Sequence, residues 1–375
     1  MRVLNQRAVL DRLRRLGAAT RPQIAKDTGL SKPTVGQALV DLERHGLVRP
    51  IGRTSAGPGR SAVVYEPNPL AGYVLGIDIG RERIRAAVAD LGGSVVARVD
   101  ERNRSRSASS VVRTVTELAS RTVADAGIAL SDVVVKVIGS PGVIDQRSRV
   151  VRHAPNLPGW ESAGVLDGLE SSLGPAVVVE NDANLAALGE HVYGAARDVR
   201  VFVCVTVGTG VGMGICVDGV LFRGAHGAAG EVGFLPYGKS ATDVQRGQFE
   251  EAAAAESVVA LAHERGLSAR TAIEVFSAAR SGDVQALEVV RVEAERLAFL
   301  VASVAAVIDP ELVVLGGGVG SNVDQLLAPM EAALRTMTPL APRIVAGSLG
   351  DGAVLSGAIA MGLEAARELV FEVTL

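Results

Sequence analysis

Residues 205–215 have the sequence VTVGTGVGMGI, in which two apolar runs flank a turn rich in glycine. The pattern predicts a strand, a turn and a second strand. Glycine in such a turn lets backbone amides approach a phosphate closely, and Thr209 can add a hydroxyl. An ordinary hairpin explains this motif better when it is taken alone, since short glycine motifs often match by accident. A second such element surrounds Asp78 and Gly80, so one element could be used twice, although the two sequences are only weakly alike.

Outward from this stretch, strand-like runs alternate with helical runs from Tyr73 onward. Such alternation is typical of an α/β architecture. Residues 66–72 precede it and are predicted to form a hinge. The predicted strands cover residues 73–78, 84–90, 133–139, 176–180, 201–207 and 312–315, and the predicted helices cover 109–126, 183–190, 249–265, 283–306 and 323–336.

Charge is unevenly distributed along the 375 residues, whose formal net charge is −3. Residues 1–65 contain 12 lysines and arginines and 4 aspartates and glutamates, a balance of +8 that leaves −11 for the remaining 310 residues. A small basic head on a large acidic body indicates that the head meets a polyanion. Chance clustering of a solvated surface would explain the charge equally well, so the pattern of the head has to distinguish the two.

Three short helices are predicted in the head. The first covers residues 5–16, with an inward face of Val9, Leu10, Leu13 and Leu16. Thr20 and Gln23 have the spacing of a capping box, which indicates the start of the second helix. Ser31 caps the third helix, whose inward residues are Val35, Leu39 and Leu42. The second and third helices therefore form a helix-turn-helix, whose last helix would enter the major groove of DNA.

The polar residues of the head suit DNA. Lys32, Thr34 and Gln37 lie on the outward face of the third helix, where they can meet base edges and phosphates. The loop at 52–60, between two predicted strands, resembles the wing of a winged helix-turn-helix and offers Arg53 and Arg60 to phosphates or the minor groove. A protein-docking module with a linker is the alternative. The charge, the capped turn and the basic wing together favour the first interpretation, a DNA-binding domain that spans residues 1–66.

Several motifs of the chain occur in one order: DIGRER at 78–83, GSPGVID at 139–145, NLPGW at 156–160, ENDAN at 180–184, GTGVGMG at 208–214, GEVG at 230–233 and LGGGVG at 315–320. In this set and order the sequence resembles the ROK family of sugar kinases and repressors over almost its whole length. The resemblance implies an α/β, two-lobed actin-like ATPase (ribonuclease H-like) fold over residues 72–375, with lobes at about 72–180 and 181–375, after the N-terminal helical winged helix-turn-helix. It also implies a homodimer or a dimer of dimers.

The same resemblance implies roles for individual residues. Asp182 matches the general base of the sugar kinases, a task that a carboxylate suits because it can accept a proton from a sugar hydroxyl. The implied sugar contacts are Asn156, Asn181, Asp182, Glu231 and Glu250. The implied nucleotide loops contain Asp78, Gly80, Gly208, Thr209, Gly210, Gly316 and Gly317. Each residue alone could equally be a helix cap or a surface group, whereas the set in one cleft favours ligand binding.

Departures from the family pattern decide which kind of member the sequence resembles. Family kinases have D-x-G-G-T-K at the first phosphate loop, where this chain has Arg81 and Glu82 in place of glycine and threonine. The added bulk and negative charge put the binding of ATP and magnesium in doubt. Phe234 occupies the position of a zinc-binding histidine, and residues 235–250 contain no cysteine or histidine, so we expect no zinc. The basic head is the feature that separates regulators of the family from its plain kinases.

The cellular setting is predicted from composition. The longest apolar run, residues 297–308, is too short to span a bilayer, and the N-terminus lacks the apolar core of a leader peptide. We therefore expect a cytoplasmic protein without a membrane partner. Cys204 and Cys216 lie in apolar strand-like runs, which indicates buried reduced thiols.

Three functions are compatible with these observations. The first is a sugar-responsive, DNA-binding transcriptional regulator, most simply a repressor of carbohydrate genes, that uses a degenerate sugar-kinase domain as its receptor. The second is an active ATP-dependent sugar kinase with an accessory head, because Asp182 and the later glycine loops are retained. The third is a scaffold with an empty cleft. The departures from the kinase pattern favour the regulator.

Overall fold

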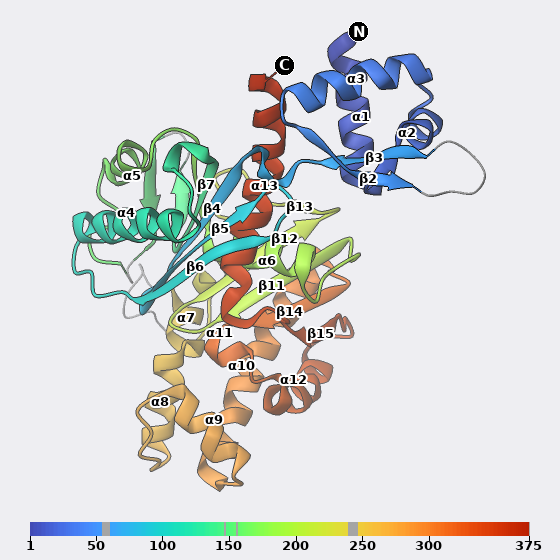
Figure 1. Cartoon of the computed structure of the whole chain (residues 1–375). Coiled ribbons are helices and arrows are strands. Elements are labelled where there is room, and N and C mark those ends of the chain that lie inside the picture. The colour runs from blue at the N-terminus through green and yellow to red at the C-terminus, as the bar shows by residue number, and fades with distance from the viewer. Residues whose placement is uncertain (55–60, 146–147, 155–156, 239–246, 375) are drawn as a thin grey trace.

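Two five-stranded sheets form the body of the computed structural model, which describes residues 1–54, 61–145, 148–154, 157–238 and 247–374 (Figure 1). The first sheet has the order β10-β7-β4-β5-β6 and the second β13-β12-β11-β14-β15. Each is built on a central strand that pairs antiparallel with the next strand and parallel with a later one. The expected repeated element is therefore confirmed. The strands are β4 Tyr73–Ile79, β5 Arg83–Asp90, β6 Val95–Arg102, β7 Val133–Ser140, β10 Val177–Asn181, β11 Val201–Val207, β12 Val211–Val217, β13 Val220–Leu221, β14 Leu312–Gly316 and β15 Arg343–Ala346.

The stretch 205–215 forms the turn between β11 and β12, which pair antiparallel from Val201↔Val217 to Val207↔Val211. This confirms the predicted strand-turn-strand. A small two-stranded sheet, β8 Val143–Asp145 with β9 Val150–Arg152, follows β7.

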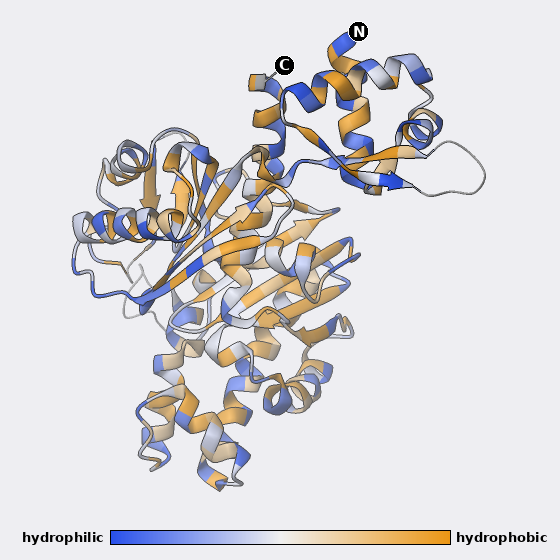
Figure 2. Ribbon diagram, in the orientation of Figure 1, coloured by the Kyte–Doolittle hydropathy of each residue, from blue (hydrophilic) through white to orange (hydrophobic). Residues whose placement is uncertain are grey.

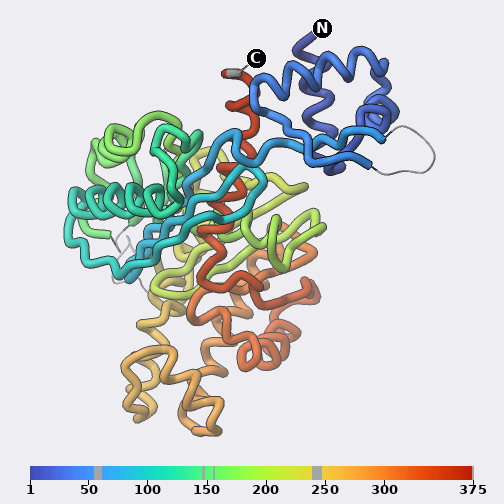
Figure 3. The backbone as a smooth tube through the Cα atoms, in the orientation of Figure 1, coloured from blue at the N-terminus to red at the C-terminus, as the bar shows by residue number. Residues whose placement is uncertain are grey.

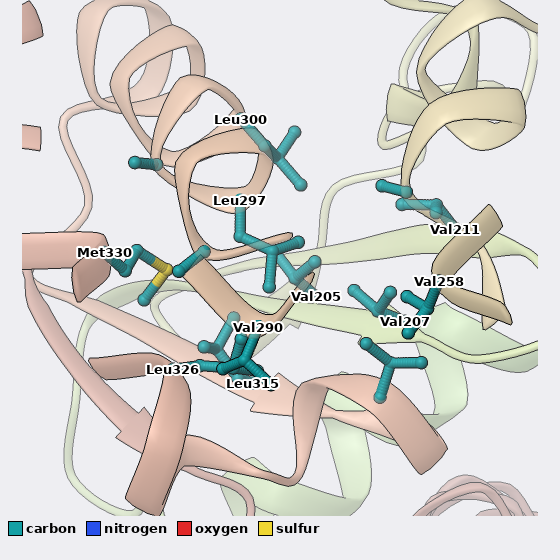
Figure 4. Close-up of a cluster of buried hydrophobic side chains, with 14 of the residues drawn as sticks. Val205, Val207, Val211, Val258, Val290, Leu297, Leu300, Leu315, Leu326 and Met330 are labelled. Carbon is teal, nitrogen blue, oxygen red and sulfur yellow. The ribbon is translucent and has the colours of Figure 1, made fainter. Parts of the chain in front are cut away.

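Helices cover both faces of each sheet, so apolar residues gather between layers (Figure 2). α4 packs on the outer face of the first sheet, and α10 with α12 packs on the outer face of the second, over the core drawn in Figure 4. α6 and α13 lie between the two sheets. The helices of the body are α4 Ala108–Asp125, α5 Val165–Leu173, α6 Asp182–Tyr193, α7 Gln248–Ala253, α8 Ala255–Glu264, α9 Ala272–Arg280, α10 Val284–Ile308, α11 Gly317–Gly320, α12 Val323–Met337 and α13 Ala353–Thr374, with short 3-10 turns η1 Pro69–Ala71, η2 Leu130–Asp132, η3 Val232–Phe234 and η4 Gly350–Gly352.

α6 and α13 cross at unusually close range. A Cβ atom on Gly357 would lie 1.8 Å from the carbonyl oxygen of Leu185, and one on Gly189 would lie 2.3 Å from that of Ala353. Only glycine fits at both positions, because any side chain would push the helices apart. The two sheets are thus joined through a helix pair whose backbones touch.

The head consists of three helices and a three-stranded sheet of order β1-β3-β2. The predicted capping box is confirmed: the Gln23 side chain accepts from the backbone N–H of Thr20 at 2.9 Å. The predicted Ser31 cap is also confirmed, since its hydroxyl accepts from the N–H of Thr34 at 3.2 Å. The elements are α1 Arg2–Leu16, β1 Ala19–Thr20, α2 Arg21–Thr28, α3 Lys32–Arg44, β2 Val48–Thr54 and β3 Ala62–Pro67.

Several local predictions were wrong. Leu16 was placed on the inward face of the first helix, but it is 59% exposed because α1 ends there, beyond the helices it packs on. The helix predicted at 249–265 is broken at Ala254, whose extended backbone separates α7 from α8. α13 was not predicted at all, yet it packs on the sheet of the first lobe and reaches the head (Figure 3).

Cys204 and Cys216 are free and buried, as expected from the sequence. Burial raises the pKa of both thiols, that of Cys216 to about 11. Among the helices of the described residues, none combines the length and apolar content that crossing a bilayer requires.

Glu293 on α10 is a charged residue inside the core of the second lobe. It is fully buried, and its Oε2 atom accepts a hydrogen bond from Arg296 Nη1 at 3.2 Å. Its Oε1 atom has no partner among the described residues. Burial raises the pKa of Glu293 to about 8, and Arg296 counteracts this only in part. A carboxyl whose pKa rises on folding stabilises the fold while it is protonated, and that contribution is lost as the pH rises through the folded-state pKa.

Glu293→Gln should therefore raise the free energy of unfolding more at pH 8 than at pH 5. Glutamine keeps the shape of the side chain but has no proton to lose, so the difference from the natural chain should grow by on the order of 1–3 kcal/mol over that range. Chemical denaturation at the two pH values measures it. If the free energy of unfolding changes with pH by the same amount in both proteins, the pKa of Glu293 does not differ between the folded and unfolded states.

Candidate functional site: the interlobe cleft and the winged head

A cavity of about 330 Å³ lies between the two lobes. Strand ends and glycine turns from both sheets line it, and they bring together residues far apart in the sequence. A smaller cavity shares Arg85, Asp182, Thr206 and Gly317 with it. Of the residues predicted from sequence, Asn181, Asp182, Glu231, Glu250, Gly80, Gly208, Thr209, Gly210 and Gly317 line the first cavity, and Asp78 and Gly316 line the second. Asn156 lies outside the described residues, so its role stays a prediction.

Asn181 and Asp182 stand where β10 turns into α6. The Asn181 side chain caps α6 by accepting from the N–H of Asn184 at 3.1 Å, and its amide donates to the carbonyl of Gly142 at 3.1 Å. Asn181 is therefore a helix cap as well as a cleft residue. Asp182 accepts from the N–H of Ala183 at 2.8 Å, and burial raises the pKa of its carboxyl. The start of α6 thus points a held carboxyl group into the cleft.

Two further carboxyl groups face this end of the cleft. Glu250 on α7 accepts from the N–H of Val211 at 2.9 Å, which ties α7 to the glycine turn. Burial, and then the charges of Asp182 and Glu250, raises the pKa of Glu231 to about 7. Three carboxyl groups and an amide in one pocket are strong hydrogen-bonding partners for vicinal hydroxyl groups.

Two residues that line the cavity were missed by sequence reasoning. His153 follows β9 and has a left-handed backbone with φ of 57°. Its ring meets that of Phe234 edge-on, with the centroids 5.3 Å apart, so the two lobes touch through an aromatic contact. Arg85 lies two residues beyond the DIGRER motif and enters both cavities. No motif marked either one: Arg85 is placed by strand register, and His153 by the left-handed turn of the backbone after β9.

The glycine turns approach each other closely at the cleft. Gly317 has a φ of 79°, and a Cβ atom there would lie 2.4 Å from the carbonyl oxygen of Val207. The first phosphate loop is also tight, since the N–H of Gly80 donates to the carbonyl of Arg83 at 2.9 Å. Arg81 was expected to crowd this loop. Its side chain instead reaches Glu256 on α8, at 3.2 Å, and so bridges the lobes at the opening of the cleft.

Trp160, the single tryptophan of the chain, anchors the loop beside the cavity. It is fully buried, and its indole N–H donates to the hydroxyl of Ser140 at the end of β7, at 2.7 Å. The N–H of Ala154, which lines the cavity, donates to Glu161 at 2.7 Å. The tryptophan therefore sits close to residues that line the cavity, and its fluorescence can report on their environment.

In the head, Lys32 and Gln37 are exposed on α3 and Thr34 is half-buried, its hydroxyl 2.8 Å from that of Ser31. Arg53 is exposed on β2. Arg60 falls outside the described residues. The structure thus presents the predicted residues of α3 along one accessible helix.

Asp41 connects the recognition helix to α1. It is buried on α3 and accepts from Arg2 at 2.9 Å and from Gln6 at 3.1 Å. The pKa of Asp41 is lowered, chiefly by the hydrogen bond from Arg2. The Gln37 amide also donates to Asp41, at 3.1 Å, which fixes how that amide is turned.

A model of the ROK family matches residues 74–365, and a model of the IclR helix-turn-helix domain matches residues 7–52. The chain belongs to the ROK family. The glucokinase of Halalkalibacterium halodurans is 31% identical over 278 residues, which are 69% of this ROK chain and 84% of the relative. The xylose repressor of Caldicellulosiruptor bescii is 27% identical over 363 residues, 91% of each chain.

Solved ROK structures agree with the two-part architecture. A ROK family transcriptional regulator described as a homologue of the E. coli MLC protein superposes with a TM-score of 0.79, covering 100% of this chain and 98% of that one at 22% identity, which shows the shared fold. A ROK glucokinase from Streptomyces griseus, solved with glucose and AMPPNP, has a TM-score of 0.68 at 28% identity and covers 77% of this chain. The predicted fold class is confirmed.

We predicted from the sequence that this ROK protein binds no zinc, because the segment after Phe234 lacks the ligands. Within the described residues no three histidine, cysteine, aspartate or glutamate side chains are grouped as metal ligands. Residues 239–246 of that segment lie outside the described residues. The absence of zinc therefore stays a prediction from sequence.

Proposed function

We propose that this ROK protein is a sugar-responsive transcriptional regulator, a repressor of carbohydrate genes, in which the cleft is the receptor and the winged head binds operator DNA. The observation that carries the proposal is the path of α13: its first residues line the cavity next to the cleft, and Phe371 near its end is buried in the core of the head. A receptor and a DNA-binding domain thus share one rigid element.

The polar end of the cleft supports a sugar as the ligand. Asp182, Glu231 and Glu250 accept hydrogen bonds, and the Asn181 amide adds a donor and an acceptor. Asn156 joins this set in our proposal. Such a site rejects analogues that lack a hydroxyl, because a buried polar group would be left unpaired. Xylose and glucose are the first sugars to test, since the relatives include xylose repressors and glucokinases.

The contacts at the end of α13 hold the head against the body. Arg14 on α1 donates through Nη2 to the carbonyl of Arg367 at 2.9 Å, and the Arg367 side chain donates to the carbonyl of Leu91 in the first lobe, also at 2.9 Å. Arg7 pairs with Glu368. Closure of the lobes around a sugar would move α13, and these contacts would pass the movement to the head. A hundredfold change in operator affinity requires about 2.7 kcal/mol of coupling.

The head supports binding to duplex DNA through Lys32, Thr34, Gln37, Arg53 and Arg60. Helix-turn-helix heads act in symmetric pairs on half-sites about one helical turn apart, so we propose a homodimer or a dimer of dimers as the active form.

A second candidate is an ATP-dependent sugar kinase, favoured by the place of Asp182 in the cleft and by the similarity to glucokinases. Under the regulator hypothesis, a coupled assay of ADP release should show no turnover with a panel of sugars that includes xylose and glucose. Turnover that Asp182→Asn abolishes would instead establish the kinase.

Electrophoretic mobility shift with DNA from upstream of the chain's own gene tests the head. Lys32→Ala should weaken binding to operator and random DNA alike, because a phosphate contact is independent of sequence. Gln37→Ala should cost about 1–3 kcal/mol on the operator and little on random DNA. Arg113→Ala on α4, far from the head in sequence and fold, is the matched control and should change neither. A natural chain without preference over random DNA at moderate salt would defeat the proposal.

Arg14→Met tests the coupling through α13. Methionine keeps much of the packing volume but removes the hydrogen bond to Arg367, so the factor by which a bound sugar changes operator affinity should fall by at least about fivefold, roughly 1 kcal/mol. Val373→Ala, an exposed position on the same helix end, is the control and should retain the full factor. An undiminished sugar effect in the Arg14 variant would show that the signal takes another route.

A further inference from the structure

The half of the cleft that faces the nucleotide loops contains a largely buried arginine, Arg85, whose guanidinium group lies among three carboxylates. Arg85 lines both cavities, and its side chain is 14% exposed. Nη1 donates to Asp78 Oδ2 at 3.0 Å, Nε lies 3.4 Å from Asp100 Oδ2 and Nη2 lies 3.4 Å from Asp351 Oδ2. One guanidinium group thus faces three carboxylates from separate elements.

Strand register holds this arrangement in place. Asp78 on β4 lies directly opposite Arg85 on β5, and Arg85 lies directly opposite Asp100 on β6. Residues directly opposite each other in a sheet project from the same face, so the three strands present a negative, a positive and a negative group in one row. The side chain of Arg85 is therefore placed by the sheet rather than by a loop that could swing away.

We propose that Arg85 is a resident cation that takes the place of the magnesium ion in this cleft and leaves no site for a magnesium nucleotide, so that the protein responds to its ligand without nucleotide. The residues present do not fit a magnesium nucleotide. Asp78 is the carboxylate in the first phosphate loop, and its charge is already compensated by Arg85. A divalent cation there would meet the guanidinium, and the two positive charges would repel each other in the low dielectric of the cleft.

The phosphate groups of a nucleotide would be repelled by the carboxylates at this end of the cleft. Asp78, Asp100 and Asp351 surround the guanidinium of Arg85, and Asp100 is also paired with Arg83 at 2.6 Å. Arg81 is directed to Glu256 at the opening of the cleft. Burial raises the pKa of Asp78 to about 6 and Arg85 opposes the rise, which agrees with a counterion role for the arginine. A polyphosphate therefore finds carboxylates where it needs cations.

Isothermal titration of the full chain with the magnesium complex of AMPPNP tests the proposal. The natural chain should show no saturable binding, and Arg85→Met should bind saturably, with a dissociation constant at least about tenfold below the highest nucleotide concentration tested, because Asp78 is then free to hold the metal ion. Arg83→Met is the matched control: it removes a neighbouring arginine that pairs with the same Asp100, and it should behave as the natural chain does. The proposal would be overturned if the natural chain bound the magnesium nucleotide saturably and at least as tightly as Arg85→Met does.

The double variant Asp78→Asn with Arg85→Met keeps the test decisive if the single variant does not fold. It leaves no unpaired buried charge, so it should fold, and it should bind AMPPNP better than the natural chain but with no dependence on magnesium. A double variant that binds no better than the natural chain would also overturn the proposal. The titration uses neither sugar nor DNA, so its result is independent of whether the protein proves to be a sugar-responsive regulator.

Discussion

The close crossing of α6 and α13 is the constraint on which the rest of the architecture depends. Gly189 and Gly357 let the two backbones touch between the sheets, and a side chain at either position would push the lobes apart. α6 begins at Asp182 in the cleft, and Phe371, near the end of α13, is buried in the core of the head. The interlobe cleft and the position of the head are therefore set by one helix pair. A ligand that changes the angle between the lobes must act on both.

Charge divides the cleft into two ends with different capacities. At one end Asp182, Glu231 and Glu250 offer acceptors to hydroxyl groups, and burial, together with the charges of Asp182 and Glu250, raises the pKa of Glu231 to about 7. At the other end Arg85 neutralises the carboxylates of the first phosphate loop from within the protein. In our proposal, a kinase fold arranged in this way keeps the means to hold a sugar and loses the means to hold a metal nucleotide. The similarity to both repressors and glucokinases fits such a history.

Local chemistry was predictable from the sequence, and long-range geometry was not. The capping box at Thr20 and the glycine turn at 205–215 depend on neighbouring residues only, so their patterns identified them. α13 is buried on several sides and lacks the one-sided apolar stripe by which a surface helix is recognised. Arg85 and His153 gain their places in the cleft from strand pairing and from a left-handed backbone, which no spacing of residues displays. For the same reason the exposure of Leu16 could not be foreseen, since it depends on where the neighbouring helices end.

The affinity of the full chain for a sugar, measured with and without saturating operator DNA, tests the central claim most directly. Fluorescence of Trp160 beside the cavity provides the readout. Thermodynamic linkage makes the effect reciprocal. If a bound sugar changes the affinity of the chain for operator DNA by some factor, bound operator DNA must change the affinity for the sugar by the same factor. The account predicts dissociation constants that differ by about tenfold or more, a coupling of at least about 1.4 kcal/mol. Equal sugar affinities for the free and the DNA-bound chain would contradict it.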